Sequence, residues 1–111
     1  MNDQSSSFVL LHDSVRKWIW RQGWTSLKEI QENSIPVVLR RDADVIISAA
    51  TAGGKTEAAF LPILSHVLSS PSEGFDVLYV SPLKALINEQ YRRLLDMTTG
   101  TDVEVTPWHG D

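Results

Sequence analysis

Short, almost entirely apolar runs constrain the fold of this chain more than any other sequence feature. Residues 45–49 (VIISA) and 77–80 (VLYV) are the two clearest runs, and each leads into a turn. A run of this length without polar alternation is typical of a parallel strand that is buried on both faces. Residues 103–106 (VEVT) form a third, weaker run because Glu104 interrupts it. The sequence therefore predicts three strands.

Amphipathic segments surround these runs. Apolar residues at helical spacing predict four helices, which in chain order cover residues 13–22, 26–41, 55–68 and 85–95. Ser26 and Glu29 have the spacing of a capping box, and Pro36 predicts a bend or break in the second helix. The alternation of strands and helices predicts an α/β fold, in which right-handed crossovers build a parallel sheet with helices on both faces.

Length and composition fit one small domain. The chain has 111 residues, and we expect an N-terminal arm over residues 1–12 and a single domain over residues 13–111. It contains no Cys, which excludes disulfides, thiolate metal sites and cysteine nucleophiles. No apolar run approaches the roughly 18 residues of a membrane span, and the N-terminus lacks the basic region of a secretory signal. We therefore expect a cytoplasmic protein without a membrane partner.

The charge is unevenly distributed. The net charge is −4, yet residues 12–41 carry six basic and three acidic side chains, whereas residues 42–111 carry four and ten. This asymmetry fits either a local basic face for nucleic acid or an ordinary solvated helix surface.

The turn after the first apolar run has the composition of a phosphate-binding loop. Residues 49–56 read AATAGGKT, which matches the last three positions of G-x-x-x-x-G-K-[ST] and has Ala49 in place of the first Gly. The backbone N–H groups of such a turn and the positive end of the next helix can cradle a triphosphate. We expect Lys55 to bridge the β- and γ-phosphates and the Thr56 hydroxyl to bind Mg²⁺. The alternative is a chance Gly-Gly turn followed by an exposed lysine.

This loop resembles motif I of superfamily 2 helicases, A-x-x-G-x-G-K-T, and departs from it at Ala52, where many members have Gly. Residues 57–64 resemble the continuing helix of DEAD/DEAH-box and Lhr-like members, and residues 23–31 (GWTSLKEIQ) resemble their Q motif. The resemblance implies that the Gln31 amide reads the adenine edge, for which it has a donor and an acceptor side by side. The implied cofactors are ATP and Mg²⁺, with Thr56 as metal ligand, Lys55 and Thr56 as catalytic residues, and a nucleotide site formed by Trp24, Gln31, Thr51, Ala52, Gly53, Gly54, Lys55 and Thr56.

Other aromatic residues have two interpretations each. The resemblance implies an upstream aromatic that stacks on adenine, and Phe8 is either this residue or an anchor of the N-terminal arm. Trp18 has the spacing of a core residue. Trp20 is a surface candidate for stacking on a nucleic-acid base.

A second part of the resemblance concerns nucleic acid. Residues 79–90 (YVSPLKALINEQ) resemble motif Ia, which implies that Ser81, Pro82, Leu83 and Lys84 hold a sugar-phosphate backbone. Gly110 and Asp111 resemble a further backbone contact of these helicases. A plain turn is the alternative for the first segment, and we expect His109 to be an ordinary loop histidine.

Together these motifs resemble the N-terminal part of the first RecA-like domain of a superfamily 2 ATP-dependent helicase. The resemblance covers residues 8–111 and implies a RecA-like P-loop parallel sheet that is incomplete, with three strands, and is truncated before the Asp-Glu box. We expect the chain alone to be inactive, and its parent to couple ATP hydrolysis to strand movement with the remainder of the helicase, including a second RecA-like domain. The resemblance favours DNA over RNA. The alternatives are a non-catalytic nucleotide- or partner-binding module and a different P-loop enzyme such as a kinase.

Overall fold

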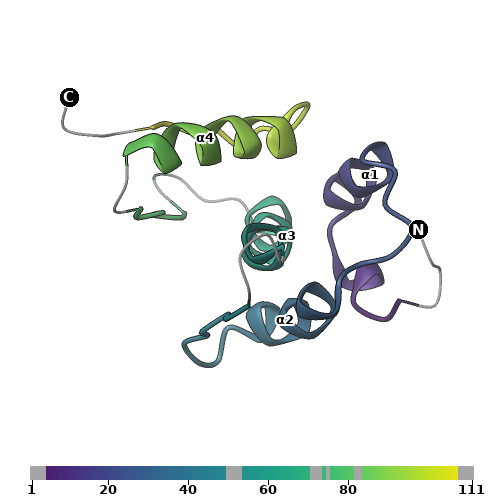
Figure 1. The fold of residues 1–111 in the computed structure, drawn as a ribbon. Coiled ribbons are helices and arrows are strands. Elements are labelled where there is room, and N and C mark those ends of the chain that lie inside the picture. Colours follow the sequence, from purple (N-terminus) through teal and green to yellow (C-terminus); the bar gives the residue numbers. More distant parts are fainter. Residues whose placement is uncertain (1–4, 50–53, 71–73, 75, 82–83, 108–111) are drawn as a thin grey trace. The chain divides into compact units, whose positions relative to one another are not determined.

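The secondary structure of the described residues is helical (Figure 1). The structure is a computed structural model that describes residues 5–49, 54–70, 74, 76–81 and 84–107. In chain order its elements are a 3₁₀ turn η1 (Phe8–Leu10) and the α-helices α1 (Asp13–Arg21), α2 (Glu29–Arg40), α3 (Lys55–Ser69) and α4 (Lys84–Thr98). The chain divides into two compact units, Met1–Ser70 and Pro71–Asp111.

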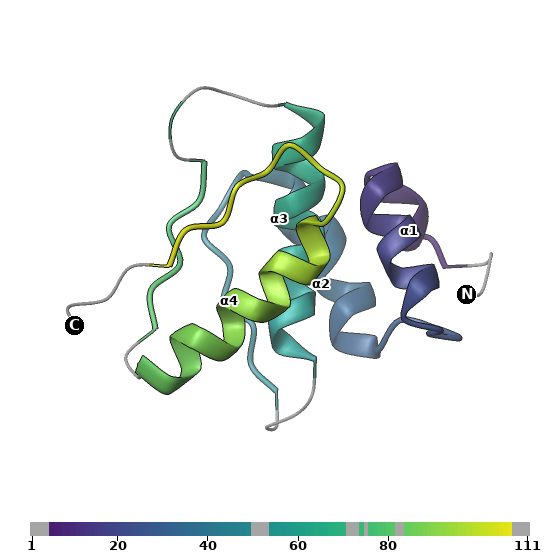
Figure 2. The same ribbon diagram turned by 90° about the horizontal axis from the view of Figure 1, so that it is seen from above.

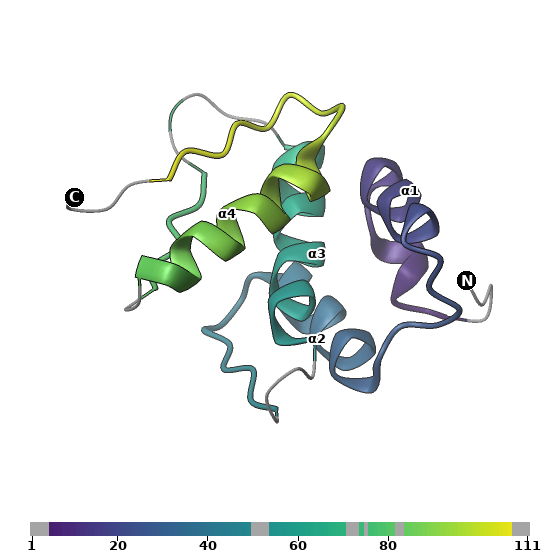
Figure 3. The same ribbon diagram turned by 45° about the horizontal axis from the view of Figure 1, so that its top comes forward.

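The prediction of a parallel sheet with three strands is wrong. Residues 45–49, 77–80 and 103–106 are not strands, and Figures 2 and 3 show them as coil between or after helices. Ile46 is 95% exposed and Leu78 is 87% exposed, although a doubly covered strand would bury both. A strand forms only when a partner in register accepts and donates its ladder hydrogen bonds. None of these three runs is paired in a strand ladder in the part of the chain that the structure describes.

The helices lie close to the predicted segments. Helix α1 begins at Asp13, where the His12 Nδ1 atom accepts a hydrogen bond from the Ser14 N–H at 3.1 Å. The His12 N–H donates to the Ser65 hydroxyl at 3.0 Å, which ties the start of α1 to α3. Gly23 follows the helix with a φ of 75°, a left-handed conformation that favours glycine.

The start of α2 differs from the sequence prediction. The helix begins at Glu29 with Lys28 as its N-cap, not near Ser26. The Lys28 N–H donates to the Gln31 Oε1 atom at 3.0 Å. An amide three residues after the N-cap can reach back to the N-cap N–H, as in a capping box. The capping box expected between Ser26 and Glu29 is therefore wrong, because Gln31 fills that role.

Prolines lie inside α2 and α3 without ending either helix. Proline has no N–H, so the carbonyl four residues earlier loses its helical donor. The Ser7 hydroxyl donates to the Glu32 carbonyl, which Pro36 leaves free, at 2.5 Å. In the same way, a serine of α2 donates to the carbonyl that Pro62 leaves free in α3. A serine from another element thus replaces each lost donor.

The core of the first unit lies between its three helices. Helix α2 packs along α3, α1 packs on α3, and η1 contacts α2. Ile19, Ile35 and Leu61 are fully buried and come from α1, α2 and α3 respectively. Burying an aliphatic side chain of this size contributes about 1.5–3 kcal/mol. This packing holds the start of α3 beside the start of α2.

The second unit contains α4, which continues three residues beyond the predicted end at Leu95. Near its end the Thr98 hydroxyl donates to the Leu94 carbonyl at 2.8 Å, and Gly100 follows with a φ of 81°. Among the described residues, no helix is both long and apolar enough to cross a bilayer.

Candidate nucleotide site

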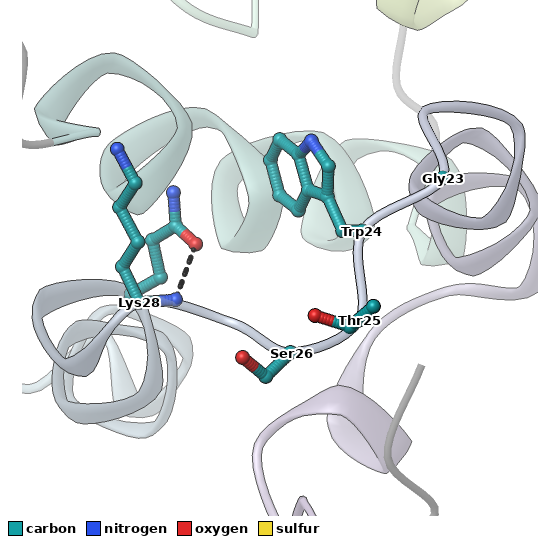
Figure 4. Close-up of a pocket in the computed structure, with 6 residues that line it drawn as sticks. Gly23, Trp24, Thr25, Ser26 and Lys28 are labelled. Carbon is teal, nitrogen blue, oxygen red and sulfur yellow. Dashed lines mark hydrogen bonds between the residues drawn. The ribbon is translucent and has the colours of Figure 1, made fainter.

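The loop between α1 and α2 forms one side of a shallow, open pocket of about 290 Å³. The pocket is lined by Gly23, Trp24, Thr25, Ser26, Lys28 and Gln31. Figure 4 shows the Trp24 indole and the Lys28 side chain rising from the same side of this loop. Its volume is just below the range of about 300–1,000 Å³ that is typical of small-molecule sites. The segment that resembles the Q motif thus forms the wall of a concave surface.

Trp24 is held in place by the core. Its ring meets the buried Trp18 ring edge to face, with centroids 5.4 Å apart and an interplanar angle of 81°. Edge-to-face contacts of this kind contribute about 0.5–1.5 kcal/mol beyond the buried area. A half-buried indole fixed in this way offers a rigid apolar wall to a planar ligand.

Gln31 joins the pocket to the start of α3. Its side chain is only 2% exposed, and the Nε2 atom donates a long hydrogen bond of 3.5 Å to the Gly54 carbonyl. The Oε1 atom is occupied by the Lys28 N–H. A primary amide has two N–H donors and two acceptor lone pairs, so one of each is left after these bonds. That pair is what an amide needs in order to read one edge of a base.

The start of α3 fits an anion. Gly54 is its N-cap residue, with a φ of 82°. Because glycine has no side chain, the N-cap residue makes no side-chain hydrogen bond to the first turn. The first turns of helices carry a positive partial charge and inward N–H groups that favour phosphate. Lys55 is exposed and Thr56 is half-buried at this end. The structure therefore brings Gln31, Gly54, Lys55 and Thr56 together at one end of the first unit.

Close packing explains why residue 54 is glycine. A Cβ atom added there would lie 2.7 Å from the Gln31 Nε2 atom and 3.1 Å from the Lys28 Cδ atom. The φ of 82° also lies in the region that L side chains rarely adopt.

Several predicted site residues remain untested. Thr51, Ala52 and Gly53 lie outside the described residues, and so do Pro82, Leu83, His109, Gly110 and Asp111. Ser81 is half-buried and Lys84 is the first residue of α4, both in the second unit. The assignment of these residues to triphosphate or nucleic acid stays a prediction.

Phe8 is an anchor of the N-terminal arm. It is buried on η1 and packs against the Trp20 ring, with centroids 6.2 Å apart. It is not among the residues that line the pocket. Trp20 is 60% exposed, and Trp18 is buried as its spacing predicted.

Hydrogen bonds from the arm also stabilise Glu32 next to Gln31. The Ser5 hydroxyl lies 2.7 Å from the Glu32 Oε2 atom, and the Ser7 N–H donates to Oε1 at 2.9 Å. Burial raises the pKa of Glu32, but these hydrogen bonds outweigh it and leave the pKa below its ordinary value. Glu32 is therefore held as a carboxylate that fixes the arm to α2.

Sequence reasoning missed part of this arrangement. Thr25, Ser26 and Lys28 line the pocket but lie between the positions that the motif specifies. The serine partners of the two helical prolines were also missed. A proline inside a predicted helix marks a free carbonyl four residues earlier, and this signal points to a missing donor without naming it.

No metal cluster is visible in the described part of the chain, where no three His, Asp or Glu side chains gather as ligands. Thr56, which carries a hydroxyl, follows Lys55 in the first turn of α3. Metal binding by a P-loop threonine is completed by the nucleotide phosphates, so a hydroxyl at this place fits that role.

Comparisons with known proteins agree with the motifs. A family model described as DEAD/DEAH box helicase matches residues 28–111. The chain is 39% identical over 94 residues to the ATP-dependent helicase Lhr-Core of Saccharolobus solfataricus, an overlap of 80% of this chain and 10% of that protein. It is 33% identical over 87 residues to the probable ATP-dependent RNA helicase DDX52 of Bos taurus, which covers 78% and 14% of the two chains.

A third relative is the probable ATP-dependent RNA helicase DDX4 of Pelophylax lessonae, with 32% identity over 108 residues, 90% of this chain and 15% of that protein. The chain thus spans only between 10% and 15% of the length of these three relatives. No solved structure matches it at a significant level.

Proposed function

The chain belongs to the DEAD/DEAH box helicase family, and from this premise we propose that it is the ATP-binding part of an ATP-dependent nucleic-acid helicase. The observation that carries the proposal is the contact between Gln31 and Gly54, which are 23 residues apart in sequence. It places an amide that lines the loop pocket beside the start of the helix that favours phosphate. A nucleotide carries a base at one end and phosphates at the other, so its binding site needs both features within the length of one nucleotide.

In this proposal each residue has a defined task. The adenine lies in the loop pocket, where Trp24 provides an apolar wall and Gln31 reads the base edge. Lys55 and the N–H groups at the start of α3 bind the phosphates, together with Thr51, Ala52 and Gly53 of the preceding loop. Thr56 holds Mg²⁺, which when bound neutralises charge on the β- and γ-phosphates.

The nucleic-acid side of the proposal rests on the resemblance alone. Ser81, Pro82, Leu83 and Lys84, with Gly110 and Asp111, would contact the sugar-phosphate backbone of one strand. The remainder of the helicase, including a second RecA-like domain, would complete the active site. The resemblance favours DNA, whereas two of the relatives described above are named as RNA helicases. Competition between single-stranded DNA and RNA of one sequence decides between them.

Lys55→Ala tests the nucleotide site. We expect isothermal titration to show weak, Mg²⁺-dependent ATP binding by the 111-residue chain and its loss in Lys55→Ala, because the variant lacks the charge that bridges the phosphates. Lys55 is exposed, so the unfolding free energy should stay within about 0.5 kcal/mol of the unaltered chain. Lys17→Ala is the matched control, since it removes an exposed lysine that pairs with Asp13 on α1. ATP binding that survives in Lys55→Ala would refute the assignment.

A further inference from the structure

The N-terminal halves of α2 and α3 are joined by two hydrogen bonds, which form a ring that is closed through the backbones of the two helices. The Gln31 Nε2 atom donates to the Gly54 carbonyl at 3.5 Å, and that carbonyl also accepts the Ala58 N–H at 2.9 Å. The Ser34 hydroxyl donates to the Ala58 carbonyl at 2.9 Å and lies 3.3 Å from the Gln31 carbonyl. The ring therefore leads from the Gln31 side chain through α3 to Ser34, and back to Gln31 along the backbone of α2.

Pro62 makes this ring possible. In an uninterrupted helix the N–H of residue 62 would donate to the Ala58 carbonyl, but proline has no N–H. The free carbonyl becomes the acceptor for the Ser34 hydroxyl across the interface. Ser34 and Ala58 are both buried, so water does not compete for these groups. The link between the two helices is thus a consequence of a serine in one and a proline in the other.

The position of the ring suggests a task beyond stability. Gln31 carries the amide that faces the base pocket, and Gly54 is the N-cap of the helix that meets the phosphates. We propose that Ser34 is a positioning residue of the nucleotide site, with Pro62 freeing its acceptor, and that the ring fixes the base-reading amide relative to the phosphate-binding helix end. This inference rests on the proposed function. A ligand that contacts both the base pocket and the start of α3 needs the ring. A ligand that contacts only the start of α3 does not.

Two ligands and two substitutions separate positioning from stability. ATP spans the base pocket and the helix end, while inorganic tripolyphosphate uses the helix end alone. Ser34→Ala breaks the ring and leaves the Ala58 carbonyl without a donor. Adding Pro62→Ala restores an N–H to that carbonyl, so the double variant repairs α3 but still lacks the link to α2. Ser69→Ala is the control, because it removes a serine-to-carbonyl bond of 2.7 Å that lies within α3.

We expect the double variant to recover the stability lost in Ser34→Ala but to bind ATP about threefold to tenfold more weakly than the unaltered chain, the equivalent of one net hydrogen bond. Its affinity for tripolyphosphate should change by less than about twofold, and Ser69→Ala should change neither affinity. If the double variant binds ATP as tightly as the unaltered chain, Ser34 serves stability alone and the inference is wrong.

Amide exchange provides a readout that needs no nucleotide. The Lys28 N–H is protected by the Gln31 Oε1 atom, so its exchange rate reports how firmly the side chain is held. We expect faster exchange at Lys28 in the double variant than in Ser69→Ala, and equal rates would contradict the positioning role. An unaltered chain that binds no ATP would overturn the proposed function instead, and the exchange result would still decide whether the ring holds Gln31.

Discussion

Gly54→Ala tests the contact on which the site depends. The substitution places a methyl group 2.7 Å from the Gln31 Nε2 atom, closer than carbon and nitrogen approach without a shift. The Gln31 amide is the end of a flexible side chain and will move. In moving it gives up its hydrogen bond to the Gly54 carbonyl inside a buried environment. The predicted cost therefore has a backbone part and a hydrogen-bond part.

Gly23→Ala isolates the backbone part. Gly23 has a φ of 75°, close to the 82° of Gly54, but a Cβ atom there meets nothing within 4 Å. The left-handed conformation costs about 1–2 kcal/mol for an L side chain, partly offset by the lower entropy of the unfolded chain. Both variants share this net cost of about 1 kcal/mol. Gly54→Ala should lose about 1 kcal/mol more, because a poorly satisfied buried amide costs about 1–3 kcal/mol and the lost bond is long.

Urea unfolding of the 111-residue chain, followed by circular dichroism at 222 nm, measures this difference. With a denaturant slope of about 1 kcal/mol/M, the midpoint of Gly54→Ala should lie about 1 M below that of Gly23→Ala. Because the extra cost arises at the Gln31 side chain, Gln31→Ala should abolish it, and the two substitutions should be non-additive by about 1 kcal/mol. Equal midpoints for the two glycine variants, or additive effects, would refute the reasoning.

Two further predictions concern the attachment of the arm to α2. Ser7→Ala leaves the Glu32 carbonyl without the donor that Pro36 cannot provide, so it should lower the unfolding free energy by about 1–3 kcal/mol, and Pro36→Ala should restore much of the loss in urea titrations. The pKa of Glu32 is lowered in the folded chain, so its stabilisation is present above the unfolded pKa of about 4.3 and is lost as the pH falls through the folded value. Between about pH 5 and pH 3 the unfolding free energy of Glu32→Gln should fall less than that of the unaltered chain, and parallel pH profiles would contradict this.

The helices and the family could be predicted from the sequence. Apolar spacing, with a glycine stop after α1 and the Ser-Ser-Pro segment at residues 69–71 for α3, predicted these two helices to within one residue. This is possible because a helix closes its hydrogen bonds within its own segment. The GKT triplet at residues 54–56 and Gln31 identified the family because their chemistry follows from residue type and spacing. The start of α2 was misplaced, because Ser26–Glu29 and Lys28–Gln31 both have the spacing of a capping box and only the fold selects one of them.

The tertiary structure decided what depends on partners far apart in the chain. The apolar run 45–49 predicts burial, but whether it becomes a strand depends on a neighbour in register, and Ile46 is exposed without one among the described residues. The sequence by itself determined the helices and the residue types of the candidate nucleotide site. Only the packing of α2 on α3 brought Gln31 to Gly54 and Ser34 to the carbonyl freed by Pro62. Non-local hydrogen bonds of this kind depend on geometry that no local pattern contains.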